Sequence, residues 1–242
     1  MDSLSVNAGP NITDWLTGIG TVAVATIAIL FYFLDRLRAK GERPILDLFI
    51  NFRPPFCHYT SVATVERAGR IHNFEAYWFR LTVANRGKTS AKDLEVIIHN
   101  VEQRVDGAWK RLSDFLPSNL KWTHTSQHYL PMLLPYTEKN IELAHIINPD
   151  ANNRGRVPGE YNHAHLKLSA AQTSVFFELT ILPVSSYNIV GPGEYRFMIT
   201  VGGSNCSPIS STFNLKLTGE WHTEENTMLT KGVEINRVRH AS

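Results

Sequence analysis

The chain has 242 residues, of which 43% are hydrophobic and 19% are charged. This composition can bury a sizeable core, and it excludes a chain that is disordered as a whole. The formal net charge of +2 is too balanced for a protein that holds nucleic acid through charge, so we expect no nucleic-acid partner. The two cysteines, Cys57 and Cys206, are too few for a disulfide framework and can form one bridge or remain as buried thiols.

The first predicted element is a membrane-spanning helix. Residues 15–34 contain no charged side chain, and a helix of that length spans about 30 Å, the thickness of a bilayer's hydrocarbon core. A cleaved signal peptide would need a basic leader and a small-residue cleavage site, and this leader is acidic. We therefore predict a short tail over residues 1–13 and a single transmembrane helix over residues 14–35, with the lipid bilayer as a partner.

Basic residues follow this helix and none precedes it, which predicts its orientation. The cluster consists of Arg36, Arg38, Lys40 and Arg43. Lys and Arg beside a membrane helix favour the cytoplasmic side. We expect a basic linker over residues 36–44, an N-terminus outside the cell (inner) membrane and a cytoplasmic C-terminal domain.

Small residues recur at every fourth position of the helix, at Thr17, Thr21 and Ala25. Such a stripe lets two membrane helices approach closely. It makes a homodimer through the transmembrane helix one interpretation, beside an ordinary lipid-facing helix.

Beyond residue 44 the apolar residues alternate with polar ones, which is the pattern of half-buried strands. No long amphipathic helix is indicated there. Seven to nine short strands separated by turns predict a mainly β domain, an antiparallel sandwich of two sheets over residues 45–219. The clearest strands are centred on Leu46–Phe52, Tyr77–Val83, Leu94–Ile98, Ile141–Ile147, Val175–Ile181, Tyr195–Val201 and Phe213–Leu217, and Asp106-Gly107 predicts a hairpin.

Two stretches carry a resemblance to a known family. Phe79–Gly87 followed by Ser90–Val96 resembles the strand–turn–strand of bacterial immunoglobulin-like, adhesion-type (CARDB-like) domains, and Gly191–Tyr195 is similar to the start of their penultimate strand. The resemblance implies an immunoglobulin-like sandwich and says little about function. Such domains usually lie outside the cell, whereas the basic cluster predicts the inside, and we follow the cluster because its residues adjoin the helix.

Two segments do not follow the strand pattern. Residues 113–137 are long and apolar for a loop, so they either cover an open edge of the sandwich or form a surface for a protein partner. The candidate surface residues are Phe115, Trp122, Tyr129, Met132, Leu133 and Leu134. From residue 220 the chain becomes polar, which predicts a loosely held tail over residues 220–242.

No sequence motif for catalysis is found, and we expect no cofactor. His163 and His165 would share one side of a strand and are the weak candidates for a metal site. This pair has no evident third ligand in the sequence. His145 falls on an apolar face, which is typical of a hydrogen-bonded core histidine.

Three functions remain open at this point. The first is a membrane-tethered binding or scaffolding module with a protein partner and no enzymatic activity. The second is a membrane-bound, metal-dependent hydrolase that uses His163 and His165. The third is an extracytoplasmic ligand-binding or adhesion domain.

Overall fold

A computed structural model of the chain describes residues 11–41, 43–65, 71–123, 125, 127–150, 166, 168–169, 171–183 and 187–238. The chain divides into two compact units between Arg43 and Pro44, one residue before the predicted domain start. The second unit contains all the strands described below and their hydrophobic core, so it has what an independent domain needs.

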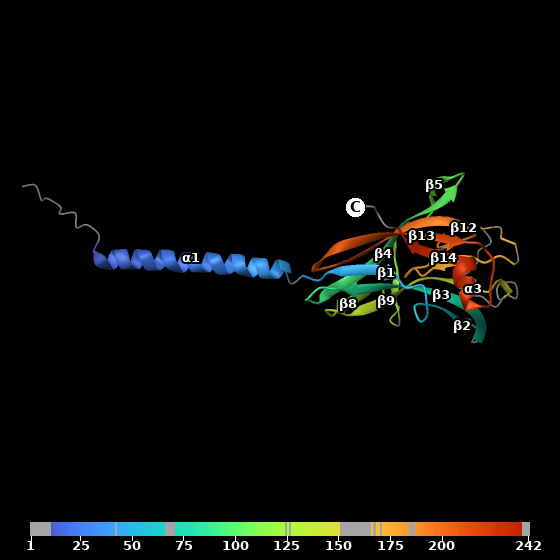
Figure 1. Ribbon diagram of the computed structural model, residues 1–242, viewed down its shortest axis with the longest axis horizontal. Coiled ribbons are helices and arrows are strands. Elements are labelled where there is room, and N and C mark those ends of the chain that lie inside the picture. The colour runs from blue at the N-terminus through green and yellow to red at the C-terminus, as the bar shows by residue number, and fades with distance from the viewer. Residues whose placement is uncertain are drawn as a thin grey trace, which may run out of the picture. The chain divides into compact units, whose positions relative to one another are not determined.

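The first unit contains one long helix, α1 (Ile12–Gly41), which confirms that the predicted element is helical (Figure 1). Its 22-residue stretch Trp15–Arg36 is long and apolar enough to cross a membrane. The mean hydropathy of this stretch is 2.0, and none of it is buried inside the protein. The hydroxyls of Thr21 and Thr26 donate to the carbonyls of Thr17 and Val22, at 2.8 Å each. No free hydroxyl is therefore left at these two positions.

The predicted linker over residues 36–44 is mostly helical. α1 continues to Gly41. Residues 35–40 contain neither Gly nor Pro, so nothing in this segment breaks the helix before Gly41, and Pro44 lies close behind.

The second unit is an antiparallel β-sandwich, as predicted. Sheet A has the strand order β1-β3-β9-β10-β11, with β2 on β3 and β7 on β9; sheet B has the order β14-β13-β12-β4-β5, with β6 and β8 on β4. The strands of sheet A are β1 (Leu46–Ile50), β2 (Cys57–Val65), β3 (Ile71–Asn85), β7 (Lys121–Trp122), β9 (Glu138–Ile147), β10 (Val175–Phe177) and β11 (Ile189–Val190). Those of sheet B are β4 (Ala91–Val105), β5 (Ala108–Arg111), β6 (Ser118–Asn119), β8 (Tyr129–Leu133), β12 (Gly193–Gly203), β13 (Cys206–Leu217) and β14 (Val233–Arg237).

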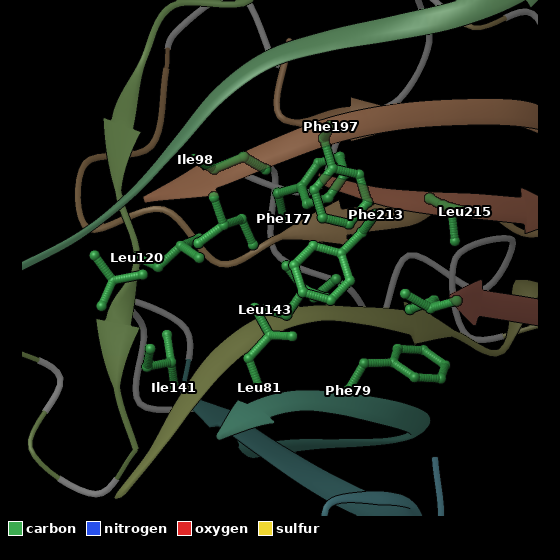
Figure 2. Packing of buried hydrophobic residues seen from close by; sticks show 14 of the residues in the cluster. Phe79, Leu81, Ile98, Leu120, Ile141, Leu143, Phe177, Phe197, Phe213 and Leu215 are labelled. Atoms are coloured by element: carbon green, nitrogen blue, oxygen red, sulfur yellow. The ribbon is translucent and has the colours of Figure 1, made fainter. Parts of the chain in front are cut away.

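Aromatic side chains from both sheets meet in the core (Figure 2). Phe177 of sheet A and Phe197 of sheet B have ring centroids 5.4 Å apart, and Phe197 stacks on Phe213 at 5.7 Å. Leu81 and Ile98 are fully buried beside them. The inward residues of each strand are the apolar ones, as the alternation predicts.

The hairpin and strand predictions hold with one exception. Asp106 and Gly107 both have positive φ, 54° and 79°, which matches the tight hairpin expected between β4 and β5. The strand predicted over Val175–Ile181 ends at Phe177, and Ile181 is exposed. Leu179 instead forms an isolated bridge with Leu120, so the chain leaves sheet A at this point.

The segment around β6 and β7 closes one side of the sandwich. β6 pairs with β4 in sheet B, and β7 pairs with β9 in sheet A. Residues 118–122 therefore cross from one sheet to the other, which confirms the interpretation that the 113–137 stretch covers an edge.

The other side is covered in part by residues after 220, so the predicted loose tail is wrong. The helical turns α3 (Glu225–Thr227) and η3 (Met228–Gly232) are followed by β14, which pairs with β13. The tail is polar on average, but it buries Met228, Leu229, Val233 and Ile235, and these few side chains hold it against the sheets.

Candidate functional site

The predicted partner-surface residues separate into two groups. Phe115, Trp122 and Leu133 are buried in the core, which corrects their assignment to a surface. Tyr129, Met132 and Leu134 are exposed. These three residues were misassigned because two kinds of segment have the same apolar composition. A segment that crosses between two sheets needs apolar side chains to pack against both, and a surface for a protein partner is also rich in apolar side chains.

The metal candidates His163 and His165 lie outside the described residues. Within the part of the chain that the structure describes, no group of three His, Cys, Asp or Glu side chains can hold a metal ion. Burial raises the pKa of the Cys57 thiol to about 12, which removes it as a thiolate nucleophile.

The orientation residues lie at and beyond the end of the apolar span. Arg36, Arg38 and Lys40 belong to the last turns of α1, and Arg43 follows the helix. The side chains of Arg36 and Arg43 are exposed.

A buried polar cluster lies on sheet A, opposite the main core. Glu178 Oε1 is 2.5 Å from His145 Nδ1, and Glu178 Oε2 accepts a hydrogen bond from Lys121 Nζ at 3.0 Å. The His145 ring lies between Trp78 and Phe176, at centroid distances of 4.8 and 5.0 Å. Only 1% of His145 is exposed, so it cannot meet a substrate, and the prediction of a hydrogen-bonded core histidine is confirmed.

This cluster gives the domain a predictable acid sensitivity. Burial by itself would raise the pKa of Glu178, but the hydrogen bond and charge of His145, together with Lys121, lower it to about 2. A carboxylate with a depressed folded pKa stabilises the fold above its unfolded pKa, near 4.3, and loses that contribution as the pH falls toward its folded pKa. We expect E178Q to lose about 1.5–3 kcal/mol of unfolding free energy at pH 7.

Urea denaturation at a series of pH values measures this effect. The difference between wild type and E178Q is expected to shrink steadily from pH 5 to pH 2.5. A difference that stays constant across that range would contradict the assignment of the stabilising charge to Glu178.

An open groove lies between the uncovered parts of the two sheet edges, and it is the candidate functional site. β1 is the last strand of sheet A on this side, and β14 pairs with β13 only over Phe213–Leu217. Between them lies a cavity of about 920 Å³, the open-edge groove. Its lining comes from three distant segments: Phe49, Ile50 and Phe52; Ser210, Ser211 and Thr212; and Ile235, Asn236, Arg237 and Val238.

One residue that lines this groove has a polar atom without a partner. Ser211 is a buried residue of β13, and its Oγ makes no hydrogen bond in the structure. A buried hydroxyl without a partner costs about 1–3 kcal/mol. It is satisfied if a ligand in the groove supplies a hydrogen-bonding group.

An ion pair crosses the same side of the sandwich. Arg237 of β14 lies 3.3 Å from the Asp47 carboxylate of β1, and both side chains are about two-fifths exposed. Exposed pairs of this kind contribute little to stability. A ligand that displaces this ion pair therefore loses little stability.

A smaller cavity of about 310 Å³ lies where the end of β5 approaches β11 and β12. Its polar groups are mostly satisfied, since Gln103 donates to the Tyr195 hydroxyl at 3.3 Å and Ser113 donates to Asp114 at 3.2 Å. None of its described lining residues has a buried polar atom without a partner. The open-edge groove is the better candidate for this reason.

Comparison with known proteins adds no family. No protein-family model matches this chain, and none of the curated proteins matches its sequence significantly. The immunoglobulin-like assignment therefore stays a prediction, and function has to be argued from the chain's own geometry.

Sequence reasoning did not find the groove. Its three segments are separated by about 160 and 25 residues, and none has a recognisable motif. The only local signal was the alternation in Leu46–Phe52, which predicts a strand without saying that the strand lies at an edge.

Proposed function

We propose that this chain is a single-pass membrane protein whose sandwich is a binding module for a protein partner at the cytoplasmic face. The apolar helix α1 and the basic residues behind it support the anchor and its orientation. The proposal assigns binding without catalysis.

The open-edge groove is the observation that carries the proposal. Among the described residues, the first half of β13, residues 206–211, has no strand partner on the side where β14 pairs with the second half. On the facing sheet, β1 pairs only with β3. Unpaired edges expose backbone N–H and C=O groups that an extended peptide can use.

The groove also offers the side-chain contacts that such a peptide needs. Ile50, Phe52 and Ile235 supply an apolar floor, and the Ser211 hydroxyl supplies a polar contact. The proposed partner is an extended segment with alternating apolar side chains, lying along β13 over residues 209–211, because Pro208 has no N–H to continue the ladder. Tethering by the helix raises the local concentration of both proteins at the membrane.

The hydrolase alternative finds no support in the described residues, because its histidines lie outside them and no third ligand is identified. The extracytoplasmic alternative depends on the orientation of the helix, and the topology experiment in the Discussion addresses it.

Site-specific photocrosslinking in native membranes tests the proposal. A benzoylphenylalanine at Asn236, which lines the groove and is exposed, should form an adduct with a partner polypeptide. The same probe at Lys216, exposed on β13 but outside the groove, is the matched control. Equal adducts at both positions, or none at Asn236, would contradict the proposal.

Substitution of Ser211 separates binding from stability. S211A removes a buried, unpartnered hydroxyl, so the domain should be as stable as wild type or about 1 kcal/mol more stable. The adduct at Asn236 should nevertheless become weaker, and S211W, which fills the groove, should abolish it. Full adduct formation by S211W would show that the partner does not use the groove.

A further inference from the structure

Several separate segments meet at the end of the sandwich that contains Pro44, the first residue of the second unit. Arg86 N donates to the carbonyl of Ile45 at 2.7 Å, and Tyr136 N donates to the carbonyl of Asn85 at 2.8 Å. The Asn85 side chain is buried and links the same segments, because its amide donates to the carbonyls of Thr89 and Leu133.

Large apolar side chains point to solvent at this end. Ile45 is 60% exposed, Met132 49%, Leu134 55% and Tyr136 68%. Ile45, Leu134 and Tyr136 lie on the segments that Asn85 joins, and Met132 is paired with Lys92 on the neighbouring strand. We call these four residues and the cations around them the Pro44-end surface.

Tyr136 adopts a backbone conformation that disfavours its side chain. Its φ is +57°, and Thr137 N donates to the carbonyl of Leu134, so residues 134–137 form a turn. With Pro135 second and a positive φ third, this is the pattern of a type II turn, whose third position normally holds Gly or Asn. Strain retained at an exposed residue points to a role for the ring itself.

The charge around these residues is basic. The segments 44–46, 85–93 and 131–139 contain four basic residues and two acidic ones. The basic residues are Arg86, Lys88, Lys92 and Lys139, and the acidic ones are Asp93 and Glu138.

We infer that the Pro44-end surface binds the headgroup region of an anionic lipid bilayer. Tyr and aliphatic side chains favour the boundary between headgroups and acyl chains, and Lys and Arg near that boundary are attracted to anionic lipid. The apolar span ends at Arg36, and the helical residues to Gly41 with the three residue steps to Pro44 reach about 18 Å, so the tether keeps the domain close to the bilayer. The inference rests on the membrane anchor of the proposed function and leaves the groove free for a partner.

Sedimentation of residues 44–242 with lipid vesicles tests the inference, since this unit has its own core. We expect binding to vesicles of phosphatidylcholine with 30% phosphatidylserine, little binding to phosphatidylcholine alone, and release by high salt. The charge reversal K88E/K139E should weaken binding at least tenfold. The matched reversal K110E/R111E on β5, at the far end of β4, should leave it unchanged.

The substitution Y136N distinguishes a membrane role from a structural one. Asn tolerates the positive φ better than Tyr, so the midpoint of thermal unfolding should stay equal or rise, while vesicle binding falls about threefold or more. Three outcomes overturn the inference: no preference for phosphatidylserine, equal loss in the β5 control, or unchanged binding by Y136N. Vesicle binding without groove crosslinks would reject only the partner proposal, and groove crosslinks without vesicle binding would reject only this surface.

Discussion

Deleting residues 220–242 is expected to unfold the β-sandwich. The deletion removes β14 and the buried side chains of Met228, Leu229, Val233 and Ile235. Each such side chain contributes about 1.5–3 kcal/mol on burial, so the loss amounts to roughly 6–12 kcal/mol. This is comparable with the whole stability of a typical domain, about 5–15 kcal/mol.

Circular dichroism and limited proteolysis of residues 44–219 measure this effect. The control ends at Val238 and keeps every described residue of β14. We expect the control to melt cooperatively like the complete domain and the shorter fragment to be degraded at once. A shorter fragment with a near-native unfolding midpoint would show that the C-terminal segment does not belong to the fold.

Moving the basic cluster to the other end of α1 is expected to invert the protein in the membrane. Replacing Arg36, Arg38, Lys40 and Arg43 by Gln, and adding four Lys residues within positions 2–9, reverses the charge asymmetry that sets orientation. The sandwich should then lie outside in most molecules.

An impermeant maleimide applied to intact cells measures the orientation. K110C introduces an exposed thiol on β5, and C206S removes the half-buried native one. In the C206S background, K110C should label only after the cells are opened, and the same protein with the inverted charges should label in intact cells. Labelling of the uninverted protein in intact cells would refute the cytoplasmic placement and favour an extracytoplasmic binding domain.

Local periodicity was sufficient to predict most of the fold. The apolar run of residues 15–34 predicts α1, and the alternation in Tyr77–Val83 and Tyr195–Val201 predicts inward-facing residues that are all buried. These predictions succeed because helical and strand periods are properties of consecutive residues.

Among the strands that escaped prediction, β2 and β14 did so because their side chains give a weak pattern. β2 has the sequence CHYTSVATV and mixes polar with apolar residues, as an edge strand does. β14 has only Val233 and Ile235 buried, within a stretch that is otherwise polar. In both cases the pairing partner, β3 or β13, stabilises a strand that the sequence hardly indicates.

The candidate surfaces depended on tertiary structure to different degrees. Tyr129, Met132 and Leu134 could be proposed as exposed because their segment is apolar and irregular. Nothing in the same stretch distinguishes them from Phe115 and Trp122, which are buried, because burial depends on which strand lies opposite.

The anchor helix, its basic flank and the β-rich character of the domain all follow from the order of residues along the chain, since each depends on neighbours within a few positions. The open-edge groove and the Pro44-end surface exist only in the folded protein. Folding brings together segments about 190 residues apart, as in the ion pair between Asp47 of β1 and Arg237 of β14, and leaves parts of β1 and β13 uncovered. Which edges stay open is decided by the packing of the whole domain, and that information is not local.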